Sequence, residues 1–212
     1  NGLTADLNLI ATAPHLLPGW LRMPQAHRVV GPVYARLPGE LPEFLADLVA
    51  GPQPLVYFAM GSSGNRDLVL HVLAGLGRAD CQVLAPVRSH LHEEDLKTLP
   101  LNVHVTDWIP AHQLGDAVDL AITHGGEGTV QTSCVQGWPF IGIPLQFEQR
   151  FNVQRCAAFG SARLVSQREA RRTDWAELVR QALADDGMRS RARRMAGLME
   201  GLDGPDRAAE AI

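Results

Sequence analysis

Short apolar runs recur along this chain and are separated by segments with the composition of helices. The runs are continuous rather than alternating, which is typical of strands that are covered on both faces. They lie at 55–59, 82–85, 103–105, 119–123, 140–143 and 163–165. Helices are expected at 67–77, 149–159 and 174–184. This alternation predicts an α/β fold, a Rossmann-like parallel sheet with helices on both faces.

The first 54 residues have a different character. A strand is expected at 5–11, but prolines then recur from Pro14 to Pro54. Proline fixes φ and removes a hydrogen-bond donor, so this density disfavours long helices and interior strands. One short helix is expected at 42–49, within a linker or a wrapped surface segment.

Composition and charge exclude several classes of protein. The chain has 212 residues, 46% of them hydrophobic, so it can form a sizeable core. Its formal net charge of -4 disfavours binding to a nucleic-acid backbone. The Arg-rich run at 189–194 is expected to be the solvated face of a C-terminal helix. No apolar run approaches the roughly 18 residues of a membrane helix, and no signal peptide is visible. Cys81, Cys134 and Cys156 are odd in number and widely spaced, so neither a disulfide framework nor a zinc site is expected, and a cytoplasmic location fits.

The most specific turn follows the run at 119–123 and reads His-Gly-Gly-Glu-Gly-Thr at 124–129. Residues 130–136 then read as a helix that is closed by Gly137. A strand, a glycine-rich turn and a helix N-terminus together gather free backbone N–H groups and the positive end of the helix dipole. The spot suits a phosphate, to which His124 could donate a hydrogen bond.

Three other loops follow predicted strands, at the sheet edge where ligands of such folds bind. The loop at 60–65 has two glycines and the hydroxyl of Ser62, although a Gly-Ser turn is often only a turn. The loop at 107–112 contains Trp108, which could offer a flat face to a base or could pack the loop onto the core. The segment at 144–152 contains Glu148 and Gln149, which could bracket sugar hydroxyls; Glu148 could instead be an acid that favours a helix N-terminus.

Together these residues resemble the nucleotide-binding half of the UDP-glycosyltransferase superfamily with the GT-B fold, especially its bacterial natural-product and sterol branches. Order and spacing agree over roughly 55–165. The matching positions are Trp108 to Pro110 (W-x-P), His124 to Thr129 (H-G-G-x-G-T), Gly137 to Pro139 (G-x-P), Glu148 with Gln149, and Asn152.

The resemblance implies a role for each loop. The 107–112 loop would border the pyrimidine, the 60–65 and 124–129 loops would hold the diphosphate, and the acid-Gln pair would contact the donor sugar. The implied nucleotide and phosphate contacts are Ser62, Trp108, Ile109, His124, Gly126, Gly128 and Thr129, and the implied sugar contacts are Glu148 and Gln149. The substrate would be a UDP- or dTDP-sugar, with no metal and no cofactor.

Relatives also carry an N-terminal domain that binds a small acceptor and supplies a general-base His. Residues 1–54 resemble the end of that domain and its Pro-rich linker, and 55–212 the donor-binding domain. The resemblance therefore implies that this chain holds no catalytic base and binds nucleotide without transferring sugar.

Three positions depart from the family pattern. Thr132 stands where many relatives have a Glu that binds ribose, and Glu148 replaces an Asp. Glu127 would repel a diphosphate, so we expect it to point to solvent or to another loop. Thr132 and Glu127 leave open a second hypothesis, a non-catalytic nucleotide-binding homologue that acts as a partner or regulator. A GT-B epimerase is disfavoured, because it would carry an acidic-Ser-Gly-Gly signature.

Overall fold

A six-stranded parallel sheet forms the centre of the computed structural model, which describes residues 5–19, 21–33, 36 and 38–212. The strand order is β5-β4-β3-β6-β7-β8. All the predicted apolar runs form strands of this sheet, so the predicted fold class is confirmed. The strands are β3 (Leu55–Ala59), β4 (Gln82–Ala85), β5 (Val103–Val105), β6 (Leu120–Thr123), β7 (Phe140–Gly142) and β8 (Ala162–Leu164).

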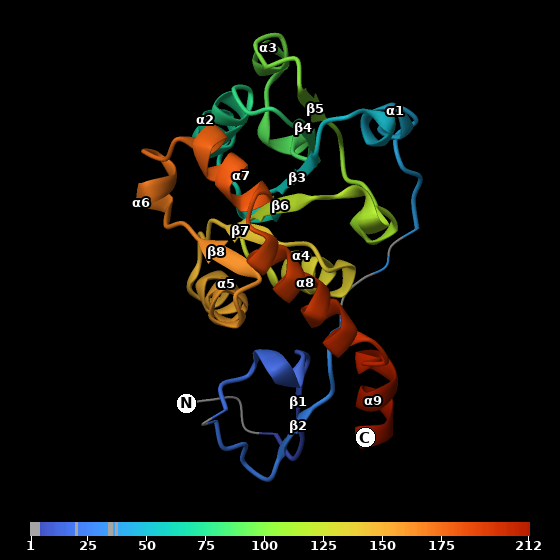
Figure 1. Cartoon of the computed structure of the whole chain (residues 1–212). Helices are drawn as coiled ribbons and strands as arrows, with labels where there is room; N and C mark the ends of the chain where they lie inside the picture. Colours follow the sequence, from blue (N-terminus) through green and yellow to red (C-terminus); the bar gives the residue numbers. More distant parts are fainter. Residues whose placement is uncertain (1–4, 20, 34–35, 37) are drawn as a thin grey trace.

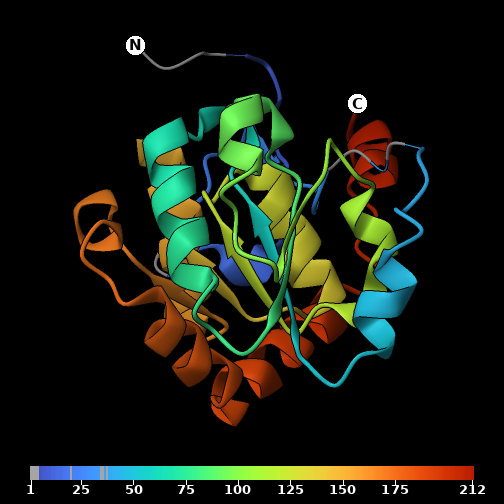
Figure 2. The ribbon, with the colours of Figure 1, turned by 90° about the horizontal axis from the view of Figure 1, so that it is seen from above.

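Helices cover both faces of the sheet, and β3 shows why its sequence is apolar throughout. Val56 and Phe58 pack into a core with α2 and α7, whereas Leu55 and Tyr57 pack into a core with α4, α5 and α8. Figure 2 shows α2 and α4 on opposite sides of the strands. The bounds are α1 (Leu45–Ala50), α2 (Arg66–Leu76), α3 (Glu93–Leu96), α4 (Glu127–Gln136), α5 (Phe147–Phe159), α6 (Gln167–Ala170), α7 (Trp175–Leu183), α8 (Asp186–Met199) and α9 (Gly204–Ala211).

The helix ends follow the expected chemistry. Gly137 and Gly160 end α4 and α5 with φ of +72° and +90°, the left-handed conformation that glycine adopts without strain. Asp174 is the N-cap of α7, and its side chain accepts a hydrogen bond from the backbone N–H of Glu177. On α8, Arg191, Arg193 and Arg194 are exposed, which confirms the solvated face.

A second, two-stranded parallel sheet precedes the main one. It pairs β1 (Asn8–Ile10) with β2 (His27–Val29), and Figure 1 shows it beside α9, on the far side of the molecule from α3. The strand expected at 5–11 is therefore present but shorter, while β2 was not predicted because it lies among prolines. The main sheet begins at Leu55, and the proposed division after residue 54 stays a prediction.

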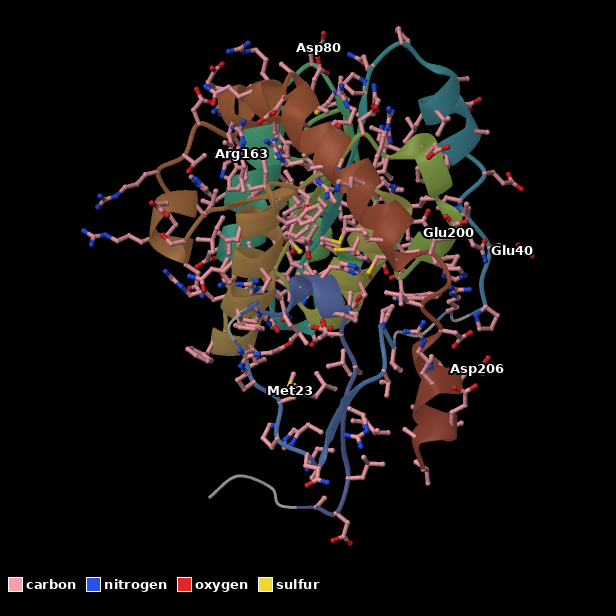
Figure 3. All side chains as sticks on the ribbon, turned by 60° about the horizontal axis from the view of Figure 1, so that its bottom comes forward. Met23, Glu40, Asp80, Arg163, Glu200 and Asp206 are labelled. Atoms are coloured by element: carbon pink, nitrogen blue, oxygen red, sulfur yellow. The ribbon has the colours of Figure 1, made fainter. Side chains whose placement is uncertain are left out.

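The first residue of α9 packs against the segment after β2. A Cβ at Gly204 would lie 2.3 Å from the carbonyl oxygen of Pro32, so only glycine allows this close approach. Figure 3 shows Glu200, from the turn before α9, and Asp206, from α9, on the same side of the molecule as Glu40. None of the helices in the described part of the chain has the length and hydropathy to cross a bilayer.

Candidate functional site

The strand order places two of the predicted loops at one point. β3 and β6 are neighbours in the middle of the sheet, and the chain continues from them to opposite edges, through β4 and β5 on one side and β7 and β8 on the other. In open parallel sheets the crevice for ligands lies at the carboxyl ends of such a strand pair. The 60–65 loop leaves the end of β3 and the 124–129 turn leaves the end of β6.

The imidazole of His124 lies between these two turns. The backbone N–H of His124 donates to the carbonyl oxygen of Ala59, 3.3 Å away, and the residue is only 7% exposed. A Cβ at Gly61 would lie 2.6 Å from His124 Cε1, and one at Gly126 would lie 2.3 Å from His124 Nε2. Both positions must therefore be glycine for the ring to occupy this place.

The surroundings of His124 favour the neutral ring in the free protein. Burial lowers the pKa of His124, and the nearby His90 lowers it further, whereas the Ala59 carbonyl and the Glu148 carboxylate oppose this shift. Nδ1 lies 3.5 Å from the Ala59 carbonyl oxygen, which can only accept, so the contact favours the hydrogen on Nδ1. In that tautomer Nε2, the atom between the glycines, is free to take up a proton when an anion arrives.

The N-terminus of α4 adds backbone donors at the same place. Its N-cap Gly126 has no side chain, and the N–H groups of the first turn, which includes Gly128 and Thr129, have no partners within the helix. These groups and the dipole of a ten-residue helix make the turn attractive to an anion. Thr132, one turn further on, donates its hydroxyl to the carbonyl of Gly128 at 2.9 Å.

Glu127 does not point to solvent. Its half-buried carboxylate accepts a hydrogen bond from Gln131 Nε2 at 2.5 Å, and burial raises its pKa. Both side chains border a cavity of about 10 Å³ beside Thr12 and Leu16. The carboxylate therefore forms a hydrogen bond within its own helix, and it borders the same cavity as the segment near Thr12 and Leu16.

The start of α5 meets both turns. Gln149 is buried and its Oε1 accepts from the backbone N–H groups of Leu145 and Gln146 at 2.8 and 3.1 Å. Its Nε2 donates to Ser63 Oγ at 3.1 Å, so one N–H of this amide remains for a ligand. Gln149 thus orients the neighbouring loop, a task that its position in the motif did not indicate.

Glu148 is exposed beside this buried amide. Asn152 Nδ2 donates to Glu148 Oε1 at 3.0 Å and to the carbonyl of Gly125 at 3.1 Å. Asn152 therefore ties the carboxylate to the His124 turn. Ser62 is exposed at the tip of its own loop, next to Ser63.

Trp108 and Ile109 lie in the loop after β5, apart from the His124 turn. Ile109 is 5% exposed and packs into the core, whereas Trp108 is 58% exposed. A Cβ at Gly39 would lie 3.1 Å from Trp108 Cζ3, so the linker lies against one edge of the ring. Ile109 performs the packing that the alternative interpretation gave to Trp108, and much of the indole stays open to a ligand.

Sequence reasoning missed His90, which lies just past β4. Its Nε2 donates to the carbonyl of Gly61 at 2.6 Å. The available signal was a histidine shortly after a predicted strand end. In the part of the chain that the structure describes, no group of three or more His, Cys, Asp or Glu side chains is arranged to hold a metal ion.

Comparisons with known proteins show the family of this chain. The family model described as "Erythromycin biosynthesis protein CIII-like, C-terminal domain" matches residues 70–210. A PGL/p-HBAD biosynthesis glycosyltransferase of Mycobacterium tuberculosis (strain ATCC 25177 / H37Ra) is 30% identical over 191 residues, which cover 90% of this chain and 44% of the relative. The 4'-demethylrebeccamycin synthase of Lentzea aerocolonigenes is 29% identical over 91% of this chain and 46% of its own length.

Solved structures show the same fold. The spinosyn forosaminyltransferase SpnP superposes with a TM-score of 0.81 at 17% identity, over 98% of this chain and 54% of that one. The spinosyn rhamnosyltransferase SpnG complexed with thymidine diphosphate gives 0.79 at 20% identity, over 99% and 57%. This chain spans about half the length of the relatives that it matches. It belongs to the family of erythromycin biosynthesis protein CIII-like C-terminal domains, the C-terminal half of GT-B glycosyltransferases.

Proposed function

We propose that this chain is the donor-binding part of an inverting glycosyltransferase that transfers the sugar of a UDP- or dTDP-sugar to a small lipophilic acceptor. The observation that carries the proposal is the meeting of the 60–65 loop, the His124 ring and the N-terminus of α4 at the ends of β3 and β6. Donors of this kind suit an anion at a switch point of the sheet. The similarity to SpnG, which was solved in complex with thymidine diphosphate, supports a nucleoside diphosphate as that anion.

The proposed roles of the side chains are those that the family resemblance implies. Ser62, His124 and the turn from Gly126 through Gly128 to Thr129 hold the diphosphate. Trp108 borders the base and Ile109 contributes backbone groups to it. Glu148 receives sugar hydroxyls, and Gln149 contributes its remaining N–H.

In the proposed reaction, a nucleophilic atom of the acceptor forms a bond to the anomeric carbon while the bond from that carbon to the nucleoside diphosphate breaks, so the configuration of the carbon is inverted. Negative charge develops on the diphosphate, where oriented amides, the helix dipole and His124 already point, so stabilisation comes from preorganised electrostatics. These groups supply the positive potential without a metal ion or a cofactor.

Residues 1–54 are proposed to be the end of an acceptor-binding domain and its linker, and 55–212 the donor domain. The general base would then come from the acceptor-binding domain. We therefore expect this chain alone to bind nucleotide but not to transfer sugar.

Calorimetric titration of the chain with UDP and with dTDP tests the proposal. We expect binding of at least one of them, with the same affinity in EDTA as in Mg²⁺. Absence of binding of both at millimolar concentration would refute the donor-domain assignment. Binding that requires Mg²⁺ would refute only the metal-independent mechanism.

A further inference from the structure

The loop from Gly61 to Ser63 is a tight turn with one exposed tip. Gly61 has a φ of +52°, a conformation that side chains rarely allow, and the N–H of Gly64 donates to the carbonyl of Met60 at 3.1 Å. Ser62 is exposed between them. The position of so short a turn is set by the side chains that contact its two ends. The orientation of Ser62 therefore depends on residues outside the loop.

One side of the loop is held from α5. The amide of Gln149 donates to Ser63 Oγ at 3.1 Å, and Gln146 Nε2 lies 3.4 Å from the same oxygen. Gln149 is itself fixed, because its Oε1 accepts two backbone hydrogen bonds at the start of the helix. The Ser63 end of the loop is therefore anchored to a rigid group.

The other side of the loop is held from β4. His90 ends the short 3-10 turn Arg88–His90, and its Nε2 donates to the carbonyl of Gly61 at 2.6 Å. A carbonyl oxygen can only accept, so Nε2 must carry the hydrogen, and both the neutral Nε2–H tautomer and the imidazolium make this bond. A Cβ at Gly64 would lie 3.2 Å from His90 Cε1, so the ring also packs closely against the far end of the turn.

The same glycine of the loop meets the other histidine. Gly61 presents its carbonyl to His90 and its Cα to His124, since a Cβ there would lie 2.6 Å from His124 Cε1. The two imidazoles thus approach one residue from β4 and from β6, the strands on either side of β3.

We propose that His90 is a positioning residue of the diphosphate site, which holds the Gly61–Ser63 loop from the β4 side while Gln149 holds it from α5. The inference rests on the proposed function, because it takes this loop to contact the diphosphate. His90 acts through Gly61 rather than on the ligand, so its loss frees Ser62 and the amides of the loop, which binding must then order again.

The test compares His90→Leu, which cannot donate, with His90→Gln, whose amide N–H can reach the same carbonyl. His71→Leu is the matched control, because His71 is exposed on α2 and its side chain makes no hydrogen bond within the described ranges. Two quantities are measured for each variant. They are the hydrogen exchange rate of the Gly64 amide in the free chain, and the dissociation constants of UDP, dTDP, uridine and thymidine.

In His90→Leu we expect Gly64 to exchange about 3- to 10-fold faster and UDP or dTDP to bind up to about 10-fold more weakly, the scale of one net hydrogen bond. The nucleosides should bind as before, His90→Gln should restore both quantities, and His71→Leu should change neither. Unchanged exchange or unchanged diphosphate affinity in His90→Leu would overturn the inference. So would equal losses for nucleosides and diphosphates, or no rescue by glutamine.

A chain that binds neither UDP nor dTDP even with His90 in place would refute the proposed function, and the placement of His90 in a diphosphate site with it. The Gly64 exchange rates would then still decide whether His90 holds the loop. Failure of the inference alone has a different signature, which is normal diphosphate binding by both the wild type and His90→Leu.

Discussion

Replacing Gly126 by alanine should disable the diphosphate site without altering the backbone. Gly126 has a φ of −61° and a ψ of 146°, which alanine adopts freely, so the new methyl group is the main change. Its Cβ would lie 2.3 Å from His124 Nε2 and 2.9 Å from Cε1, so the buried ring must rotate away from its place against Gly61. The substitution should therefore remove the hydrogen bond from His124 to the diphosphate. A hydrogen bond from a charged donor contributes about 1.5–3 kcal/mol, so UDP or dTDP should bind about 10- to 150-fold more weakly.

Calorimetry of a double-mutant cycle with His124→Ala isolates this effect. If Gly126→Ala acts through the ring, it should cost nearly nothing in the His124→Ala background. It should also leave the affinities for uridine and thymidine unchanged in the wild-type background. Equal losses from Gly126→Ala with and without His124 would refute the reasoning, and so would undiminished diphosphate binding.

Three further predictions test other parts of the molecule. Burial lowers the pKa of His124 in the folded chain, so near the ordinary histidine pKa the unfolded chain binds more protons, and the free energy of unfolding should fall as the pH drops through about 6.5. Thermal unfolding of His124→Ala should depend less steeply on pH, and an equal slope in the variant and the wild type would contradict the buried neutral ring. Trp108→Ala should weaken the binding of UDP or dTDP by about 10- to 100-fold, the scale of base stacking, and leave the affinity for inorganic pyrophosphate unchanged. Similar losses of affinity for nucleotide and pyrophosphate in calorimetry would contradict the place of Trp108 at the base. Gly142→Ala would bring a Cβ within 2.4 Å of Val153 Cγ2 and should lower the free energy of unfolding in urea by about 1–3 kcal/mol. Val153→Ala should partly restore the stability of this variant, and additive losses in the double variant would show that the clash is not the cause.

The sheet could be predicted from the sequence because each of its strands has a recognisable pattern within a few consecutive residues. Each strand is buried on both faces and therefore reads as a continuous apolar run, as at Leu55–Ala59. The glycine-rich turn after β6 was also predictable, since a strand, a turn and a helix follow one another directly in the chain. β2 could not be predicted, because a three-residue strand among prolines is too short to show a periodic pattern.

The contacts that organise the site join residues far apart in sequence. His90 and Gly61 are separated by 29 positions, and Gln149 and Ser63 by 86. No periodicity records such pairs, so the motif indicated that Gln149 matters without indicating that it anchors a loop. Glu127 was uncertain for a similar reason, because its direction depends on Gln131 and on the segment near Thr12 and Leu16.

The placement of His124 between Gly61 and Gly126 has a consequence for recombining this domain with its relatives. A chimera that imports only the loop after β3, with any residue larger than glycine at position 61, would force the ring out of a turn that had not been changed. Where a parent has a larger residue at position 61, the loops after β3 and β6 must therefore be exchanged as a pair. A library that shuffles them independently would lose the members that join such a loop to the His124 turn, even where each parent loop works in its own background.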